Sequence, residues 1–153
     1  MNRVLRVLVL SLGYGLAGPV SAGPIAADLP QEARLSRAPV GGIGGLWEGR
    51  YAYSDGRAPV PFLLSLRLDG DRSVKGRVYE PNTFGDAQAA FLYAHVSGEF
   101  DGRVLRFRKT YDGTGGQRHS VQYQGRVDPQ TRRINGEWDI NGLRGHFEAT
   151  FRE

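Results

Sequence analysis

Apolar and polar residues alternate along most of the chain after residue 45, and this alternation indicates β-strands. In GEWDINGLRGHFEATF, Gly136 to Phe151, one set of alternate positions is apolar or glycine, and the other is mostly charged or polar. Strict alternation predicts strands with one buried side and one side in water. The central Asn141-Gly142 is the preferred dipeptide of a two-residue type I′ turn. The segment is therefore predicted to be a β-hairpin.

The position of this turn fixes how the two strands of the hairpin pair. Ile140 is expected opposite Leu143, and Trp138 opposite Gly145. Asp139 then faces Arg144 on the wet side, where opposite charges stabilise the pairing. A glycine opposite Trp138 leaves room for the indole ring. Isolated glycines on a buried face are typical of sheets that coil round on themselves.

Similar alternation recurs through the rest of the chain. Six further strands are predicted, within 46–53, 61–68, 74–80, 91–100, 104–111 and 119–127. About eight short strands with short connections indicate an antiparallel sandwich or an up-and-down barrel. Glycines interrupt most of these strands, at Gly49, Gly76, Gly98, Gly125, Gly136 and Gly145. They favour an all-β fold with a single antiparallel up-and-down β-barrel over residues 45–153, and the sandwich is the alternative.

The first 22 residues have the pattern of a secretory signal peptide. Arg3 and Arg6 precede an apolar run, and Val20-Ser21-Ala22 supplies small residues at a cleavage position. Glycines and a proline break the apolar run, which argues against a membrane span, because a span needs about 20 apolar residues. Residues 23–44 are rich in Ala, Pro and Gly and are predicted to be a flexible leader. The protein is therefore expected to be exported, either periplasmic or secreted.

Composition narrows the function classes. The chain has no Cys, so an exported form has no disulfide and no site for lipid attachment after the apolar run. Loss of the two arginines of the signal would lower the net charge from +4 to +2. So small a charge gives no support to nucleic-acid binding.

Several of the predicted strands resemble a known family. The segments GLWEGRY, LRFRKTY, HSVQYQGRV, RINGEWDI and GHFEATF are similar, in order and spacing, to the avidin/streptavidin barrel of the calycin superfamily. The similarity covers Gly45 to Arg152. The resemblance implies a barrel whose ligand pocket is walled by aromatic rings, here those of Phe107, Tyr123 and Trp138. General lipocalin-like barrels are equally compatible with the pattern.

The polar groups that hold biotin in that family are not matched. Gly49 stands where the family has Asn, and His119 and Val121 stand where it has Ser and Thr. Phe147 occupies the place of an Asp. A buried ureido group without these partners would lose several kcal/mol of binding free energy. The resemblance thus implies a scaffold and argues against tight biotin binding.

The residues predicted to point into the barrel combine aromatic rings with two charges. The candidate ligand-binding residues are Trp47, Tyr51, Glu80, Phe107, Lys109, Tyr111, Tyr123 and Trp138. They predict non-covalent binding of a small apolar or aromatic molecule. The alternative is a core filled by these same side chains. In that case the protein would act through its loops as a protein-binding module, such as an extracytoplasmic inhibitor of a hydrolase.

Two structural observations would separate these hypotheses. An interior cavity of about 300 Å³ or more, lined by Trp47, Phe107 and Trp138, would favour a small ligand. A filled interior beneath ordered, protruding loops at 82–90 and 112–118 would favour a protein partner. The glycine-rich segment 112–118 is itself expected to be a flexible loop at the barrel mouth.

Lys109 lies between Phe107 and Tyr111 on the apolar side of its strand, where an unpaired charge is costly. Three explanations are open. Its partner is a carboxylate such as Glu80, it binds an anion, or the strand leaves the core and places Lys109 in water.

The remaining chemistry is sparse. No catalytic constellation of nucleophile, base and orienting group is found, so the protein is not expected to be an enzyme. His95, His119 and His146 are on separate strands without metal-ligand spacing, and neither a metal nor a cofactor is predicted. A basic strip is expected from Arg103, Arg106, Arg108 and Arg118. Two interpretations of this strip are open: the arginines are solvated on an outer face, or they contact an acidic partner. The pattern leaves the oligomeric state open.

Overall fold

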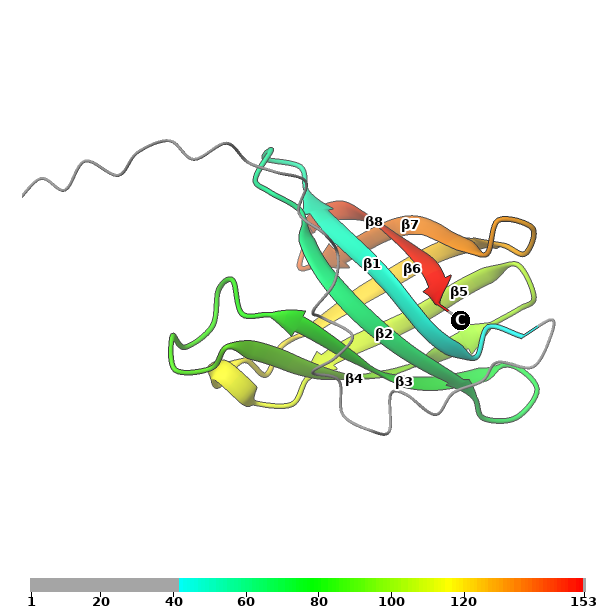
Figure 1. The fold of residues 1–153 in the computed structure, drawn as a ribbon, viewed down its shortest axis with the longest axis horizontal. Coiled ribbons are helices and arrows are strands. Elements are labelled where there is room, and N and C mark those ends of the chain that lie inside the picture. Colours follow the sequence, from blue (N-terminus) through cyan, green and yellow to red (C-terminus); the bar gives the residue numbers. More distant parts are fainter. Residues whose placement is uncertain (1–41, 153) are drawn as a thin grey trace, which may run out of the picture.

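The computed structural model describes residues 42–152, which form one closed barrel of eight antiparallel strands (Figure 1). Each strand pairs with the next in the chain, and the last pairs with the first. The strands are β1 Gly45–Tyr53, β2 Val60–Leu68, β3 Ser73–Pro81, β4 Phe91–Phe100, β5 Val104–Tyr111, β6 Ser120–Asp128, β7 Arg133–Ile140 and β8 Leu143–Arg152. The predicted all-β up-and-down barrel is confirmed, and the sandwich alternative is wrong.

The predicted signal peptide, 1–22, and the predicted leader up to residue 41 lie outside the described residues. The end of the predicted leader differs from expectation. Ile43 is fully buried in the core, and its carbonyl accepts a hydrogen bond of 2.9 Å from the indole N–H of Trp47. Within 42–152, no helix is long and apolar enough to cross a membrane.

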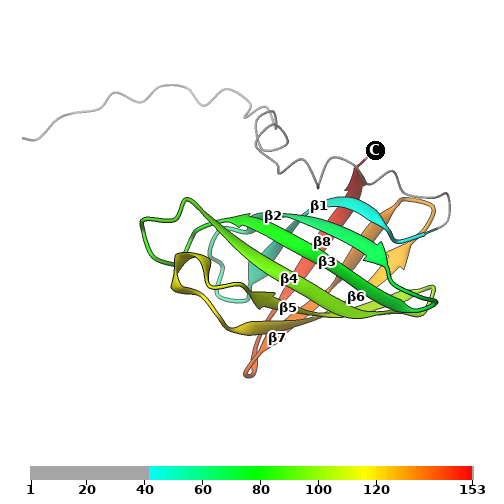
Figure 2. The ribbon, with the colours of Figure 1, turned by 90° about the horizontal axis from the view of Figure 1, so that it is seen from below.

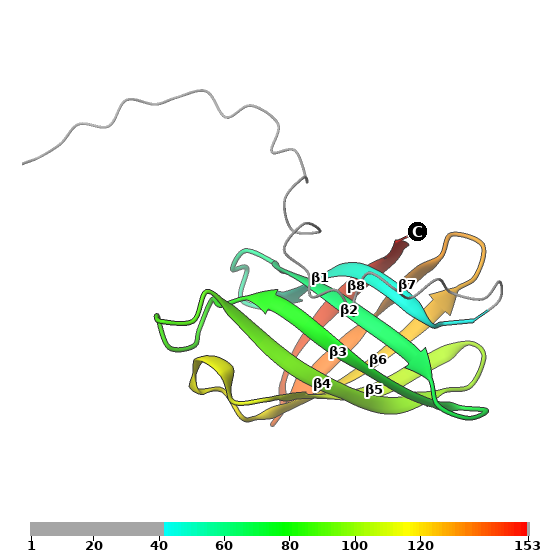
Figure 3. The same cartoon turned by 60° about the horizontal axis from the view of Figure 1, so that its bottom comes forward.

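The barrel closes where β1 meets β8, so that no strand edge in the sheet is left unpaired (Figure 3). Trp47 lies opposite Phe151 and Tyr51 opposite Phe147 in this pairing. The rings of Trp47 and Phe151 pack edge to face, with centroids 5.3 Å apart. The first and last strands are thus joined by backbone pairing and by aromatic packing.

The β7–β8 hairpin has the predicted register. Trp138 pairs with Gly145, Asp139 with Arg144 and Ile140 with Leu143. Asn141 and Gly142 have φ values of 51° and 86°, as a type I′ turn requires. A Cβ atom on Gly145 would lie 2.5 Å from Cζ2 of Trp138 and 2.0 Å from the carbonyl oxygen of Ala52. Only glycine therefore allows the indole ring and β1 to approach β8 this closely.

Side chains fill the middle of the barrel. The rings of Phe107 and Tyr123 are stacked, with centroids 4.8 Å apart and planes inclined by 5°. Phe147 packs edge to face against Tyr123, with centroids 5.1 Å apart. Aliphatic side chains complete the packing, among them the fully buried Leu64, Leu105 and Ile134. Most of the buried hydrophobic residues form one continuous core through the barrel, and Leu63 and Tyr79 form a second, smaller cluster.

One end of the barrel, the left end in Figure 1, is where β1, β3, β5 and β7 end. We call this end the mouth. Two loops at the mouth, 82–90 and 112–119, lie side by side (Figure 2). The amide of Asp86 donates to the carbonyl of Gly115, at 2.8 Å. The Asn82 side-chain amide donates to the carbonyls of Asp86 and Ala89. The predicted flexible loop contains a 3-10 turn, Thr114–Gly116, and the bond between Asp86 and Gly115 joins it to the 82–90 loop.

Candidate functional site

A pocket of about 220 Å³ opens at the mouth of the barrel. Residues of β1, β5, β6, β7 and β8 form its wall, and side chains from three loops reach its rim. Its lining residues are Tyr51, Tyr53, Arg57, Phe84, Lys109, Tyr111, His119, Val121, Tyr123, Trp138, Ile140 and Leu143. We call it the mouth pocket. Most of its wall is aromatic or aliphatic, and its charged floor is Lys109.

A buried ion pair lies beneath this pocket. Nζ of Lys109 on β5 is 2.9 Å from Oε2 of Glu80 on β3, and the two residues are 2% and 0% exposed. Both positions belong to the inward-facing set of their strands, which explains why two charged residues meet inside the barrel. Of the three explanations for Lys109, pairing with Glu80 is confirmed.

Tyrosine hydroxyls complete the hydrogen bonding of the pair. Tyr111 donates to Oε1 of Glu80 and accepts a bond of 2.9 Å from Nζ of Lys109. The Tyr51 hydroxyl also donates to Oε1 of Glu80, at 3.4 Å. Among the described residues, no buried side-chain nitrogen or oxygen lacks a hydrogen-bond partner. The charged pair is therefore paired and hydrogen-bonded, as burial requires.

Three aromatic rings surround the ammonium group of Lys109. Its Nζ lies 4.9 Å from the ring centroid of Tyr51, 4.6 Å from that of Tyr111 and 5.5 Å from that of Tyr123. The negative faces of such rings attract a cation within about 6 Å. The site therefore stabilises a buried positive charge through one carboxylate and three rings.

The environment shifts the proton equilibria of these groups. Burial lowers the pKa of Lys109, because it removes the ammonium from water, while Glu80 opposes the change. Burial, and then the charge of Glu80, raises the pKa of the Tyr51, Tyr111 and Tyr123 hydroxyls. These hydroxyls therefore stay protonated, and those of Tyr51 and Tyr111 donate hydrogen bonds to Glu80.

Aromatic side chains also form the rim. The rings of Tyr111 and His119 have centroids 4.7 Å apart, and Phe84 packs edge to face on Tyr111 at 5.8 Å. Burial lowers the pKa of His119, and the nearby charge of Lys109 lowers it further. On the opposite side, Tyr53 packs against Trp138 with centroids 5.1 Å apart. The pocket is thus entered between rings that come from several strands.

Five of the eight predicted ligand-binding residues line the mouth pocket: Tyr51, Lys109, Tyr111, Tyr123 and Trp138. Glu80 lies directly below them, bonded to Lys109. Trp47 and Phe107 do not line this pocket. Trp47 packs at the opposite end of the barrel, and Phe107 belongs to the filled middle. The predicted cavity of about 300 Å³ or more, lined by Trp47, Phe107 and Trp138 together, is not found within residues 42–152. The middle of the barrel is filled, which is the outcome expected for a protein-binding module, and the space open to a small ligand is a smaller pocket at the mouth.

The lining includes residues that were not among the predicted site residues. Tyr53 and Ile140 follow the inward alternation of their strands, so a longer candidate set would have contained them. His119 lies just before β6. In the sequence it stands at the position of a polar biotin ligand of the avidin family and lacks metal-ligand spacing, and neither feature marked it as part of the pocket. Arg57 and Phe84 come from loops, where no periodic pattern indicates the direction of a side chain.

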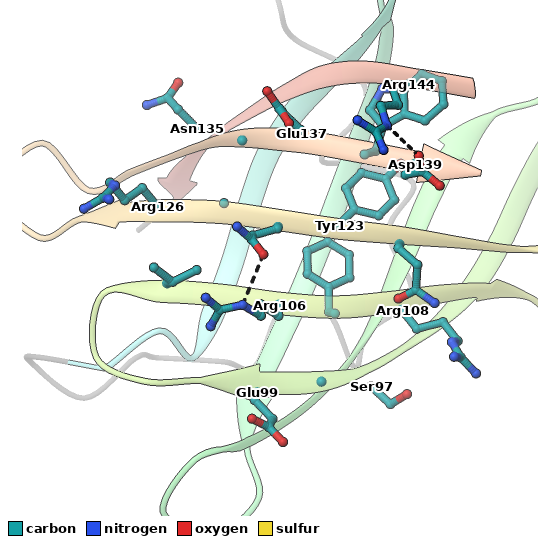
Figure 4. Close-up of a pocket in the computed structure, with 18 residues that line it drawn as sticks. Ser97, Glu99, Arg106, Arg108, Tyr123, Arg126, Asn135, Glu137, Asp139 and Arg144 are labelled. Carbon is teal, nitrogen blue, oxygen red and sulfur yellow. Dashed lines mark hydrogen bonds and ion pairs between the residues drawn. The ribbon is translucent and has the colours of Figure 1, made fainter. Parts of the chain in front are cut away.

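A larger hollow of about 1070 Å³ lies on the outer face of β4–β8 (Figure 4). Its surface carries Arg106, Arg126, Asn135, Glu137 and other polar side chains, which spread over the strands in the figure. Several of them bond to one another, as Arg144 does to Asp139 at 2.9 Å. The polar outer hollow gives little shelter from water, so we take the mouth pocket as the candidate site.

The predicted basic strip is divided by the fold. Arg106 and Arg108 line the outer hollow on β5. Arg103 lies in the turn before β5, at the end opposite the mouth, whereas Arg118 lies in the loop at the mouth. Between residues 42 and 152, no group of three or more His, Asp or Glu side chains is placed to hold a metal ion.

Comparison with known proteins shows the fold. No family model matches the chain, and no curated protein matches it. A solved structure described as the de novo design of a fluorescence-activating beta barrel aligns with a TM-score of 0.51 and 14% sequence identity. The alignment covers 72% of this chain and 94% of the designed barrel. A likeness at this identity concerns the eight-stranded barrel alone.

Proposed function

We propose that this protein is an exported barrel that binds a small apolar or aromatic molecule non-covalently in the mouth pocket. The observation that carries the proposal is a pocket with aromatic walls above the buried Lys109–Glu80 pair. Ligand sites typically combine apolar walls with a few convergent polar groups. Export is supported by the basic, apolar and small-residue pattern of residues 1–22.

The dimensions of the pocket limit the ligand. Its volume of about 220 Å³ is below the range of roughly 300–1,000 Å³ typical of drug-sized ligands. A compound with a single substituted ring, or a compact bicyclic ring system, fits this space. Such a ring would pack edge to face or offset-stacked against Trp138 and Tyr51. A carbonyl or hydroxyl group on it would accept a hydrogen bond at the floor, from Lys109.

The scaffold supports the same proposal. An eight-stranded barrel has room for its own side chains or for one small ligand. The designed barrel with the same fold is described as fluorescence-activating. The avidin-like strand motifs also favour a barrel that takes its ligand at an open end, with a ligand other than biotin.

Calorimetric titration with indole and with benzyl alcohol tests the proposal. The wild-type protein should bind one molecule of either compound. His119→Trp narrows the entrance and should weaken binding at least about tenfold, which corresponds to about 1.4 kcal/mol. His95→Trp places the same large ring on the exposed outer face of β4 and should leave affinity unchanged. Equal affinities in both variants, or no binding of either compound by the wild type, would exclude the mouth pocket as a site for such molecules.

A protein partner at the mouth is the second candidate function. A backbone bond from Asp86 to Gly115 joins the 82–90 and 112–119 loops. Phe84, on the first of these loops, is 42% exposed at the rim of the pocket. An ordered loop with an exposed aromatic ring is a common anchor in protein interfaces. Assays of purified extracytoplasmic glycosidases and peptidases would detect inhibition. Inhibition that Phe84→Ser abolishes and His119→Trp preserves would support this function, and its absence with every enzyme would count against it.

A further inference from the structure

The amine of Lys109 is a buried nucleophile at the floor of the mouth pocket. Its Nζ donates hydrogen bonds to Glu80 and Tyr111. An ammonium group has three N–H donors, so these two bonds leave one N–H, and the structure places Tyr51, Tyr111 and Tyr123 rings around it. A ligand in the pocket therefore lies next to this nitrogen.

We propose that Lys109 captures small aromatic aldehydes as a Schiff base. The proposal rests on the mouth pocket proposed above and adds a covalent bond to the non-covalent complex. Lysines with a desolvated amine are the residues that proteins use to form such imines with carbonyl compounds.

The reaction needs no further reagent. Glu80 accepts a proton from the ammonium, which leaves a neutral amine and a carboxylic acid. The nitrogen lone pair then forms a C–N bond with the aldehyde carbon, and the carbonyl oxygen takes protons and leaves as water. The product is a protonated imine, and Glu80 is again a carboxylate. One aldehyde and one lysine ammonium thus give one iminium and one water molecule, and the net charge is unchanged.

The surroundings of Lys109 suit both the free amine and the product. Burial lowers the pKa of this lysine, which increases the share of free amine at neutral pH. The iminium keeps a positive charge at the same nitrogen. Glu80, at 2.9 Å, and the three tyrosine rings therefore stabilise the product as they stabilise the ammonium. The apolar wall also restricts the access of water that would hydrolyse the imine.

The pocket selects among aldehydes by size and charge. An uncharged aldehyde on a single aromatic ring fits the volume of about 220 Å³ and packs against Trp138. An aldehyde that carries a carboxylate would place a second negative charge near Glu80, which is 0% exposed, and should react poorly.

Reductive trapping tests the proposal. The protein is incubated with benzaldehyde and sodium cyanoborohydride, and intact-mass and peptide mass spectrometry locate the benzyl group. Lys75, the other lysine of the chain, is an internal control, because its side chain is 53% exposed and its ion pair with Asp69 lies on the surface. We expect Lys109 to be labelled at least about tenfold faster than Lys75. Labelling of Lys75 and the amino terminus with Lys109 left unmodified would overturn the proposal.

Matched variants and an unreactive ligand complete the experiment. Lys109→Arg keeps the charge and should abolish the pocket adduct, whereas Lys75→Arg should leave it unchanged. Benzyl alcohol has the same ring but no carbonyl group, and its binding is measured in parallel. Binding of benzyl alcohol without labelling of Lys109 would overturn Schiff-base formation and leave the proposed function intact. Absence of both would overturn both proposals.

Discussion

Nζ of Lys109 and Oε2 of Glu80 are 2.9 Å apart inside a barrel whose other buried side chains are hydrophobic. Neither residue contacts bulk water to any extent, and the tyrosine hydroxyls supply the remaining hydrogen bonds. Removing two charges from water costs several kcal/mol for each ion, and the pair offsets this only when its geometry is good. The pair therefore gives the mouth pocket a charged floor and makes the folded barrel sensitive to loss of either partner.

Glu80→Gln should destabilise the protein by about 3–5 kcal/mol, because it leaves the Lys109 ammonium buried without a counter-charge. Adding Lys109→Met should restore most of the loss, since Gln still accepts hydrogen bonds from the tyrosines. Urea denaturation at pH 7 measures both changes. A loss below about 1 kcal/mol in the single variant would mean that the ammonium is solvated or uncharged in the folded protein.

Stability should fall steeply as the pH rises above 10. Tyr51, Tyr111 and Tyr123 have raised pKa values in the folded state, so they keep protons that the unfolded chain releases near pH 10. Their contribution is complete below pH 10 and is lost above it, at about 1.4 kcal/mol per pH unit for each tyrosine. Lys109 acts in the opposite direction, because its pKa is lowered in the folded state. At pH values below its ordinary pKa of 10.5, the folded protein therefore binds fewer protons at this residue than the unfolded chain does.

Urea unfolding between pH 8 and about 11.5 tests this dependence. The fall in stability should begin as the pH approaches 10 and should reach a slope of about three protons above the ordinary lysine range, where Lys109 no longer opposes the tyrosines. Tyr111→Phe should reduce the slope by one proton. A stability that is constant through pH 10 to 11 would contradict the burial of these hydroxyls.

Trp138→Ala should cost about 3–5 kcal/mol of the free energy of unfolding, the usual scale for deleting a buried aromatic ring. Trp138 is 4% exposed and covers Gly145, and its indole N–H donates to the carbonyl of Ala52 at 3.1 Å. Chemical denaturation gives the value, with the exposed Leu68→Ala as a control that should change it little. A loss under about 1 kcal/mol would show that the ring is not part of the core.

Replacing Asn141-Gly142 with Ala-Ala should destabilise the closing turn by about 1–3 kcal/mol, because both residues have positive φ. The effect should be local, with faster hydrogen exchange at the β7–β8 turn and unchanged exchange in β2 and β3. Unaltered stability and exchange would show that the type I′ conformation carries no cost for alanine.

Much of the fold could be predicted from the sequence, because a barrel strand repeats every two residues. The alternation gave the inward face of each strand, and Asn141-Gly142 gave the exact register of the last hairpin. Glycines such as Gly145, beneath Trp138, indicated a coiled sheet rather than a flat one. These signals are local, and each depends only on backbone geometry and burial.

The site was less predictable because alternation gives the face of a residue but not its height along the barrel axis. Trp47 and Phe107 share the inward face with Trp138, yet they lie at the far end and in the filled middle. The pairing of Glu80 with Lys109 depends on how the strands are staggered around the barrel. Phe84 reaches the rim through loop contacts, for which the sequence has no periodic signal.

The most direct test of the proposed ligand site uses the two tryptophans of the chain as reporters of the two ends of the barrel. Trp138 lines the mouth pocket, whereas Trp47 is buried at the opposite end. In a proton–nitrogen NMR titration with benzyl alcohol, we predict that the indole N–H signal of Trp138 shifts in a saturable manner. The Trp47 signal should stay in place. Shifts confined to the outer face of β4–β8, or equal shifts of both indole signals, would contradict binding in the mouth pocket.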